Sequence, residues 1–337
     1  MASSRAFHVA QPHGEFTAFE HDIPRPGPGT VLLRVEACGI CHGDAVVKEG
    51  HWPGIQYPRV PGHEVAGVVE EAGAGVEGWK PGDRAGVGWC GDYCGECMPC
   101  RRGDFMSCQK QKIAGLTFDG GYAQYMIAPA RGLARIPAGL TAAEAAPLMC
   151  AGITTFNALR HSGAMPGDLV AVQGIGGLGH MALQFARAFG YQVVAISSGR
   201  DKEELALKLG AHRYLDAGSV KAGEELQRLG GAKVILATAP SASAMSAALP
   251  GLGLDGTLIA VAVPAEPLQV PVGMLLGGRK AIRGWASGTP RDSEDTLNFC
   301  LTHGIRPMIE TFPLADVPTA YERMMSGKAR FRSVLTM

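Results

Sequence analysis

The sequence predicts a two-domain α/β protein, in which a partly closed β-barrel is followed by a doubly wound parallel sheet. Its length of 337 residues is typical of two domains. Residues 1–150 carry short β-branched runs between turn clusters, and strands alternate with helices from residue 151. We therefore predict domains at 1–150, completed by 288–337, and at 151–287.

The first domain is expected to be built from short strands. Alternating or β-branched runs predict strands at 30–35, 65–70 and 122–127. Turn clusters such as PRPGPG and KPGDR separate these runs, and their proline content argues against long helices. A partly closed barrel buries such strands. A last strand at 333–337 is expected to return to this domain.

The second domain is expected to consist of parallel βαβ units. Its buried strands alternate with helices, which is the pattern of right-handed crossover connections. The predicted strands lie at 168–173, 192–197, 233–237 and 258–263, and the predicted helices at 151–162, 180–189 and 202–209.

Composition excludes several classes of partner. Acidic and basic residues number 31 each, so neither nucleic acid nor an anionic membrane is expected as a partner. The N-terminal residues lack the apolar core of a signal peptide, and no apolar stretch has membrane-spanning length. We expect a cytoplasmic protein whose nine cysteines are reduced.

Four closely spaced cysteines predict a structural metal site. Thiolates with the spacing CxxCxxCx7C can surround one Zn²⁺ tetrahedrally and leave no ligand position open. The metal is therefore expected to stabilise a loop without taking part in chemistry. The four residues are Cys94, Cys97, Cys100 and Cys108.

A glycine-rich loop predicts a dinucleotide site of the Rossmann type. It follows the strand at 168–173 and opens the helix at 180–189, the context in which this motif is specific. Gly174 permits a tight turn, Gly176 lets the backbone approach a pyrophosphate, and Gly179 allows close packing of helix on strand. The predicted cofactor-binding residues of the loop are Gly174, Gly176, Gly177, Leu178 and Gly179.

The end of the next strand favours NADP(H) over NAD(H). Ser197 and Ser198 stand where an NAD site usually has an acid, and Arg200 and Lys202 follow. Hydroxyl groups and cations suit a 2′-phosphate. Two alternatives stay open: the two cations are solvated charges at a helix start, or Asp201 binds the ribose of NAD(H).

Three further motifs contain metal-ligand residues: CGICHGD at 38–44, PGHE at 61–64 and CAGIT at 150–154. Two thiolates and one imidazole form a three-ligand zinc site with an open position. With CxxCxxCx7C and GIGGLG in the same order, the chain resembles the zinc-dependent alcohol dehydrogenases of the medium-chain dehydrogenase/reductase superfamily over essentially its whole length. Two cysteines and one histidine are a known catalytic zinc ligand set of that family. The resemblance implies a GroES-like catalytic domain and a Rossmann domain.

The resemblance also implies roles for individual residues. Cys41, His63 and Cys150 are expected to bind a catalytic zinc, and Glu64 to lie behind the metal or ligate it briefly. Asp44 is expected to orient the ligand histidine. The alternative for Asp44 is a surface acid that caps a helix.

Other residues are expected to contact cofactor or substrate. By resemblance, His42 and Arg332 approach the cofactor phosphates and Thr154 lies near the nicotinamide. Trp52 and Trp89 fall where the family builds its substrate pocket. The alternatives are an ordinary surface position for Arg332 and core positions for the two tryptophans.

Gly43 departs from the family pattern. Family members commonly have Ser or Thr there, which passes on a proton, and a histidine at the position of Val46. The usual proton path is therefore incomplete. We expect extra room beside Gly43, filled by a water that reaches His42 or His51 or by a bulky ketone.

The predicted function is an alcohol dehydrogenase and aldehyde or ketone reductase that transfers hydride in a cleft between the domains. It carries two zinc ions per chain, one catalytic and one structural, and forms a homodimer or homotetramer. The rivals are a zinc-independent quinone or enoyl reductase of the same superfamily, a non-enzymatic cofactor-binding protein and a zinc-finger module.

Overall fold

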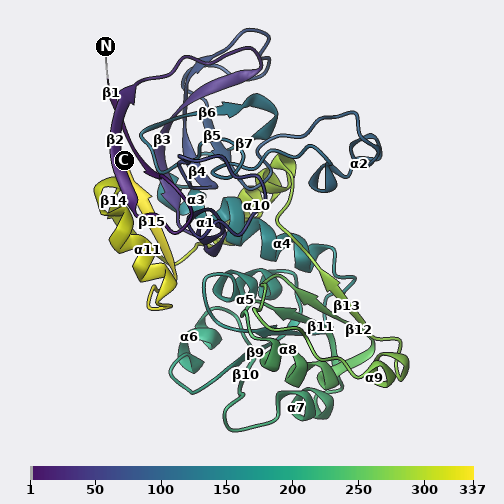
Figure 1. The fold of residues 1–337 in the computed structure, drawn as a ribbon. Coiled ribbons are helices and arrows are strands. Elements are labelled where there is room, and N and C mark those ends of the chain that lie inside the picture. Colours follow the sequence, from purple (N-terminus) through teal and green to yellow (C-terminus); the bar gives the residue numbers. More distant parts are fainter. Residues whose placement is uncertain (1–2) are drawn as a thin grey trace. The chain divides into compact units, whose positions relative to one another are not determined.

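The computed structural model describes residues 3–337, which form two compact units (Figure 1). Unit 1 contains the chain up to Ile153 together with Ser287–Met337, and unit 2 contains Thr154–Ala286. The sequence-based boundaries lay after residue 150 and before residue 288. Across residues 3–337, the structure contains no helix long and apolar enough to span a membrane.

Unit 1 is built on a seven-stranded, mostly antiparallel sheet with the order β14-β15-β3-β4-β5-β7, in which β6 also pairs with β3. A separate two-stranded sheet joins β1 to β2. The strands are β1 (Ser3–Val9), β2 (Phe16–Asp22), β3 (Thr30–Gly39), β4 (Glu64–Ala72), β5 (Arg84–Val87), β6 (Tyr125–Pro129), β7 (Leu133–Arg135), β14 (Ile309–Pro313) and β15 (Arg332–Thr336).

The helices of unit 1 are α1 (His42–Lys48), α2 (Met98–Arg101), α3 (Ala142–Pro147), α10 (Pro290–His303) and α11 (Val317–Met325). Local sequence explains the limits of α10. Thr289 accepts a hydrogen bond from the Asp292 amide and the Asp292 side chain accepts one from Thr289, while Gly304 ends the helix in the left-handed conformation.

Strand register brings three distant segments of unit 1 together. Gly39 at the end of β3 pairs with Glu64 at the start of β4 on one side and with Val334 of β15 on the other. The return of β15 to this sheet agrees with the expected last strand. Because the three strands share one core, this register places the residues after β3, before β4 and at the start of β15 next to one another.

Unit 2 is a six-stranded parallel sheet with the order β10-β9-β8-β11-β12-β13. Its strands are β8 (Leu169–Gln173), β9 (Gln192–Ser197), β10 (Arg213–Asp216), β11 (Ala232–Ala237), β12 (Leu252–Ala260) and β13 (Ala281–Gly284). Its helices are α4 (Ile153–Arg160, which begins at the boundary), α5 (Gly179–Ala188), α6 (Glu203–Lys208), α7 (Ala222–Arg228), α8 (Ala242–Ala248) and α9 (Val272–Leu276).

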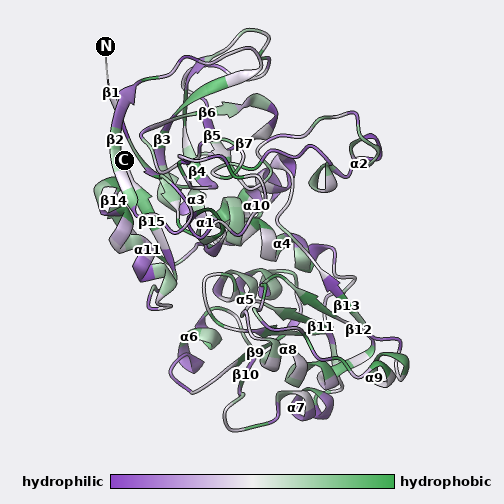
Figure 2. Cartoon of the chain, viewed as in Figure 1, coloured by the Kyte–Doolittle hydropathy of each residue, from purple (hydrophilic) through white to green (hydrophobic). Residues whose placement is uncertain are grey.

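The apolar strands of this sheet stand out in Figure 2, where β11 and β12 are green. Sequence reasoning found these buried strands and missed β10 and β13, which lie at the two edges of the sheet. Both edge strands are four residues long and no residue of either is fully buried, so neither carries a continuous apolar run.

Three other predictions need correction. The strand predicted at 258–263 lies earlier, because β12 begins at Leu252 and ends at Ala260. The strand predicted at 122–127 begins at Tyr125, because Tyr122 lies in a bend and donates its amide to the Pro61 carbonyl. The helix predicted at 151–162 is preceded by a π-helical turn, Leu148–Gly152, and ends at Arg160. π-Helical turns recur at functional sites, and this one carries Cys150.

Candidate metal centres and cofactor loop

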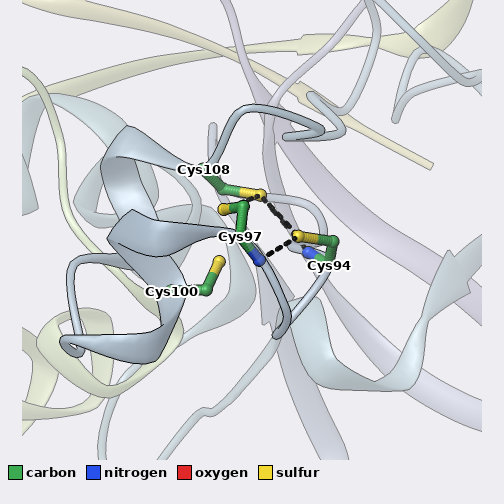
Figure 3. Close-up of side chains that lie close together, drawn as sticks. All are labelled: Cys94, Cys97, Cys100 and Cys108. Carbon is green, nitrogen blue, oxygen red and sulfur yellow. Dashed lines mark hydrogen bonds between the residues drawn. The ribbon is translucent and has the colours of Figure 1, made fainter.

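The four-cysteine motif forms a compact sulfur cluster on a loop of unit 1 (Figure 3). The sulfurs of Cys94, Cys97, Cys100 and Cys108 all lie within 4.8 Å of one another. Backbone amides point at them: Cys97 N lies 3.4 Å from Cys94 Sγ, and Cys94 N lies 3.3 Å from Cys108 Sγ. Backbone hydrogen bonds lower the pKa of Cys97 to about 6, which favours the thiolate. Four soft donors at this spacing fit a tetrahedral zinc ion.

The second cluster unites residues from three separate segments of unit 1. Ligand atoms of Cys41, His63, Glu64 and Cys150 lie within 4.8 Å of one another, and the two sulfurs are 3.9 Å apart. Cys41 precedes α1, Glu64 opens β4, and Cys150 sits on the π-helical turn. The structure therefore brings all four sequence-predicted ligand residues together.

The chemistry of this cluster fits a metal ion. The buried His63 Nε2 and Glu64 Oε2 make no hydrogen bond to any of residues 3–337. Leaving such groups unpaired costs about 1–3 kcal/mol each, and a metal ion would satisfy them. A hydrogen bond with Cys150 lowers the pKa of the Cys41 thiol well below its usual range, and thiolates are the form that binds zinc.

Asp44 holds the two ligand-bearing segments together. Its buried carboxylate accepts the His63 Nδ1 proton at 2.9 Å and the Gly62 amide at 3.2 Å on Oδ1. On Oδ2 it accepts the Cys41 amide and the Tyr122 hydroxyl, each at 2.9 Å. Asp44 also caps α1 from its third position, but it is buried, so the alternative of a surface acid is wrong. A proton on Nδ1 leaves the lone pair of Nε2 free for a metal.

Glu64 is paired with a buried arginine. Arg332 Nη2 donates to Glu64 Oε1 and, at 3.1 Å, to the Ile40 carbonyl. Burial raises the pKa of Glu64 to about 7 even though the Arg332 charge lowers it. The arginine is 3% exposed, so it is not an ordinary surface residue, and its expected contact with cofactor phosphates stays a prediction.

The expected space beside Gly43 does not exist. A methyl group placed on Gly43 would lie 2.7 Å from His63 Cε1 and 3.0 Å from Trp89 Cζ3. The indole of Trp89 stands edge-on to the imidazole, with ring centres 5.0 Å apart at 88°, and Trp52 contacts Trp89 at 6.2 Å between ring centres. The extra room expected at the missing Gly43 side chain was therefore a wrong prediction, because the rings of His63 and Trp89 fill that position.

Other histidines and cysteines of this unit, and Val46, occupy varied surroundings. His42 and His51 are exposed, and Val46 is half-buried on α1. Cys38 and Cys90 are buried, and burial raises the pKa of each thiol. Neither belongs to a metal-ligand cluster among residues 3–337.

In unit 2, the glycine loop joins β8 to α5 as predicted. Gly174 has a φ of +94°, and a methyl group on Gly179 would lie 1.9 Å from the Gly174 carbonyl oxygen. A methyl group on Gly176 would meet nothing within 4 Å, so this glycine faces open space. The turn, the close packing and the open face are the three features that a pyrophosphate site needs. Sequence reasoning missed Thr238, whose hydroxyl donates to the Gly174 carbonyl at 2.8 Å.

The loop after β9 carries the residues expected to select the cofactor. Ser198 and Arg200 are exposed, and the Arg200 Nε lies 3.0 Å from Glu203. The loop is held from β10, since Asp216 accepts the Gly199 amide at 2.8 Å. Ser197 and Lys202 are partly buried, and Thr154 is buried at the start of the unit.

Comparison with known proteins identifies the family. Residues 27–138 match the model of the alcohol dehydrogenase GroES-like domain, and residues 177–302 match that of the zinc-binding dehydrogenases. The alcohol dehydrogenase patD of Penicillium expansum is 44% identical over 95% of this chain and 94% of its own. The chain belongs to the zinc-binding alcohol dehydrogenases of the medium-chain dehydrogenase/reductase superfamily.

Other relatives of this alcohol dehydrogenase agree. An alcohol dehydrogenase of Geobacillus stearothermophilus is 39% identical over 94% of both chains. A cinnamyl alcohol dehydrogenase of Sorghum bicolor superposes with a TM-score of 0.89 at 32% identity, covering 99% of this chain and 98% of its own. The predicted fold class, enzyme class and family are confirmed, and the family is one of zinc-binding dehydrogenases.

Proposed function

We propose that this alcohol dehydrogenase interconverts an alcohol and an aldehyde or ketone, exchanging hydride with NADP(H) at a zinc site formed by Cys41, His63 and Cys150. The observation that carries the proposal is the partly buried two-thiol, one-imidazole cluster, whose imidazole is hydrogen-bonded to Asp44. A zinc ion held there would act as a Lewis acid on the substrate oxygen. A second zinc at the four cysteines would serve structure alone.

The residues of the site would share the work. Asp44 would keep the Nδ1 proton of His63 in place and so fix the tautomer that offers Nε2. Glu64 would stand behind the ligands, with Arg332 as its counter-charge. Trp52 and Trp89 would present an aromatic wall to the substrate. This wall supports primary alcohols and aldehydes with an apolar or aryl body.

Proton transfer would differ from the usual family route. Gly43 and Val46 carry no group that transfers protons. Because the space beside Gly43 is filled, a water that relays the proton to His42 or His51 would lie elsewhere.

Support for NADP(H) comes from the loop after β9, where hydroxyl groups and cations replace the usual acid. A structural neighbour from Helicobacter pylori, 29% identical with a TM-score of 0.87 over 100% of this chain and 98% of its own, is described as complexed with NADP(H). We also propose a cytoplasmic homodimer or homotetramer whose partner is a small alcohol or aldehyde, with no nucleic acid or membrane partner.

Initial rates with a panel of aldehydes and ketones, run with NADPH and NADH side by side, test this proposal. Arg200→Ala should raise the KM for NADPH about tenfold and leave that for NADH unchanged, as expected for the loss of a charged hydrogen bond. Arg228→Ala is the matched control, because Arg228 pairs with Glu225 at the same three-residue separation on α7.

Equal or faster turnover with NADH would contradict the choice of NADP(H). Metal analysis separates the zinc enzyme from the zinc-independent reductases: two zinc ions per chain support the proposal, and one would contradict it.

A further inference from the structure

Tyr122 is a fully buried side chain whose hydroxyl has one clear task. It donates to Asp44 Oδ2 at 2.9 Å, the same oxygen that accepts the Cys41 amide. Burial and the Asp44 carboxylate raise the pKa of Tyr122 well above its usual range, so the hydroxyl keeps its proton and donates. Charge-assisted hydrogen bonds of this kind are stronger than neutral ones.

The backbone around Tyr122 braces the segment that precedes His63. Tyr122 N donates to the Pro61 carbonyl at 3.0 Å, and Gly121 N donates to the Gly62 carbonyl at 3.0 Å. Gly62 has a φ of +106°, and a methyl group on it would lie 2.7 Å from Tyr122 Cδ1. The ring therefore packs directly on the backbone that presents the ligand histidine.

These contacts make Tyr122 different from a tyrosine that only fills the core. Tyr321 belongs to the same core cluster, and both rings contact Phe16, at 6.0 Å and 5.1 Å between ring centres. The Tyr321 hydroxyl is also buried but makes no hydrogen bond to any of residues 3–337. Of these two hydroxyl groups, that of Tyr122 alone is thus connected to the ligand segments within the described chain.

We propose that Tyr122 is a positioning residue for the catalytic zinc site, acting through Asp44 on both Cys41 and His63. The inference rests on the proposed zinc chemistry and extends it to a residue that is separated from the metal ligands by Asp44. With the hydroxyl in place, the Asp44 carboxylate accepts four hydrogen bonds, two on each oxygen. These four bonds hold the carboxylate in one orientation. Without the hydroxyl, the carboxylate and the imidazole gain freedom, and the ligand geometry loosens.

The test compares Tyr122→Phe with Tyr321→Phe in the full-length protein. Each change removes one hydroxyl from the same core. Chelator-driven loss of zinc from the Cys41 site should be about 3- to 30-fold faster in Tyr122→Phe, which is less than the roughly 10- to 100-fold typical of groups bonded directly to a ligand, because Tyr122 bonds Asp44 instead. The visible absorption bands of cobalt(II) bound at that site should shift, and kcat should fall with little change in the KM for the cofactor. Tyr321→Phe should match the wild type in every readout.

Asp44→Asn completes the design. If Tyr122 acts through Asp44, the double variant should lose zinc no faster than Asp44→Asn alone. Additive effects, or a Tyr122→Phe protein whose cobalt spectrum and zinc retention equal those of Tyr321→Phe, would overturn the proposal. So would a Tyr122→Phe chain that fails to fold while Tyr321→Phe folds, because a positioning role predicts a folded protein. If the wild type oxidises no alcohol, the proposed function fails, yet the metal readouts still decide the role of Tyr122.

Discussion

The two ligand clusters of unit 1 are built on opposite principles. The four cysteines come from residues 94–108 and lie on one partly exposed loop. The cluster of Cys41, His63, Glu64 and Cys150 comes from three segments held by the main sheet, and a buried network surrounds it. In the first cluster the metal would order the loop, whereas in the second the protein orders the ligands. A site meant for chemistry needs this prior order because its open position must keep its shape.

The largest effect should come from removing a ligand of each cluster in turn. Cys41→Ala should lower turnover about a thousandfold or more, since it removes a ligand of the Lewis-acid site, while the zinc content falls from two ions to one. Cys97→Ala should instead expose residues 94–108 to proteases and lower the unfolding temperature, with turnover of the folded protein reduced less than about tenfold. Metal analysis, limited proteolysis and rate measurements check both. If both variants stay folded and lose activity equally, the two clusters do not differ in role as proposed.

A smaller effect on turnover should come from adding a side-chain carbon next to the cluster that contains His63. Gly43→Ala would place a methyl group 2.7 Å from His63 Cε1, so either the imidazole or the Trp89 ring must move. Overpacking of this kind costs about 1–3 kcal/mol, and we expect kcat/KM to fall roughly 10- to 100-fold. Gly27→Ala is the control, because a methyl group there meets nothing within 4 Å. Unchanged kinetics for Gly43→Ala would show that the ligand ring is free to shift.

The smallest effect should come from removing an ion pair on the four-cysteine loop, and it should appear in the unfolding temperature. Lys110 lowers the pKa of Glu96, so the folded protein favours the ionised carboxylate. The contribution to stability is therefore present above the ordinary glutamate pKa of about 4.3 and is lost as the pH falls through the lowered value. Both side chains are exposed, and Glu96→Gln should lower the unfolding temperature by less than about 1 °C at pH 7. The unfolding temperatures of the wild type and of Glu96→Gln, measured from pH 7 to pH 3, give the effect of the ion pair. We expect the difference between the two temperatures to shrink on acidification, and a difference that grows would contradict the expectation.

The two clusters also differ in how far the sequence predicts them. The four cysteines follow one another within one loop, so their spacing alone shows that they can share a metal. The other cluster could be predicted only by combining separate motifs with a family resemblance, because strand register brings its members together. The glycine loop was predictable for the same reason as the four cysteines, since its turn, open face and helix start are consecutive.

The residues that surround the second cluster could not be predicted from the sequence. Tyr122 lies about eighty residues from Asp44, and no local pattern links them. The space beside Gly43 was misjudged because a missing side chain suggests a void, whereas Trp89 from a distant turn fills it. Edge strands β10 and β13 were missed because short exposed strands lack an apolar run. Long-range packing decides each of these features.

The pairing of Glu64 with Arg332 joins two residues that lie 268 positions apart in the sequence. Glu64 is the first residue of β4, whereas its counter-charge belongs to β15, the final strand of the sequence. During synthesis, 268 residues separate the acid from its positive partner, so the acid emerges long before Arg332 does. A chain that stops short of Arg332 would bury a lone carboxylate beside two sulfurs, which favours protonation or unfolding over metal capture. Synthesis of the chain through Arg332 and the ability of this cluster to hold an ion would thereby be tied together.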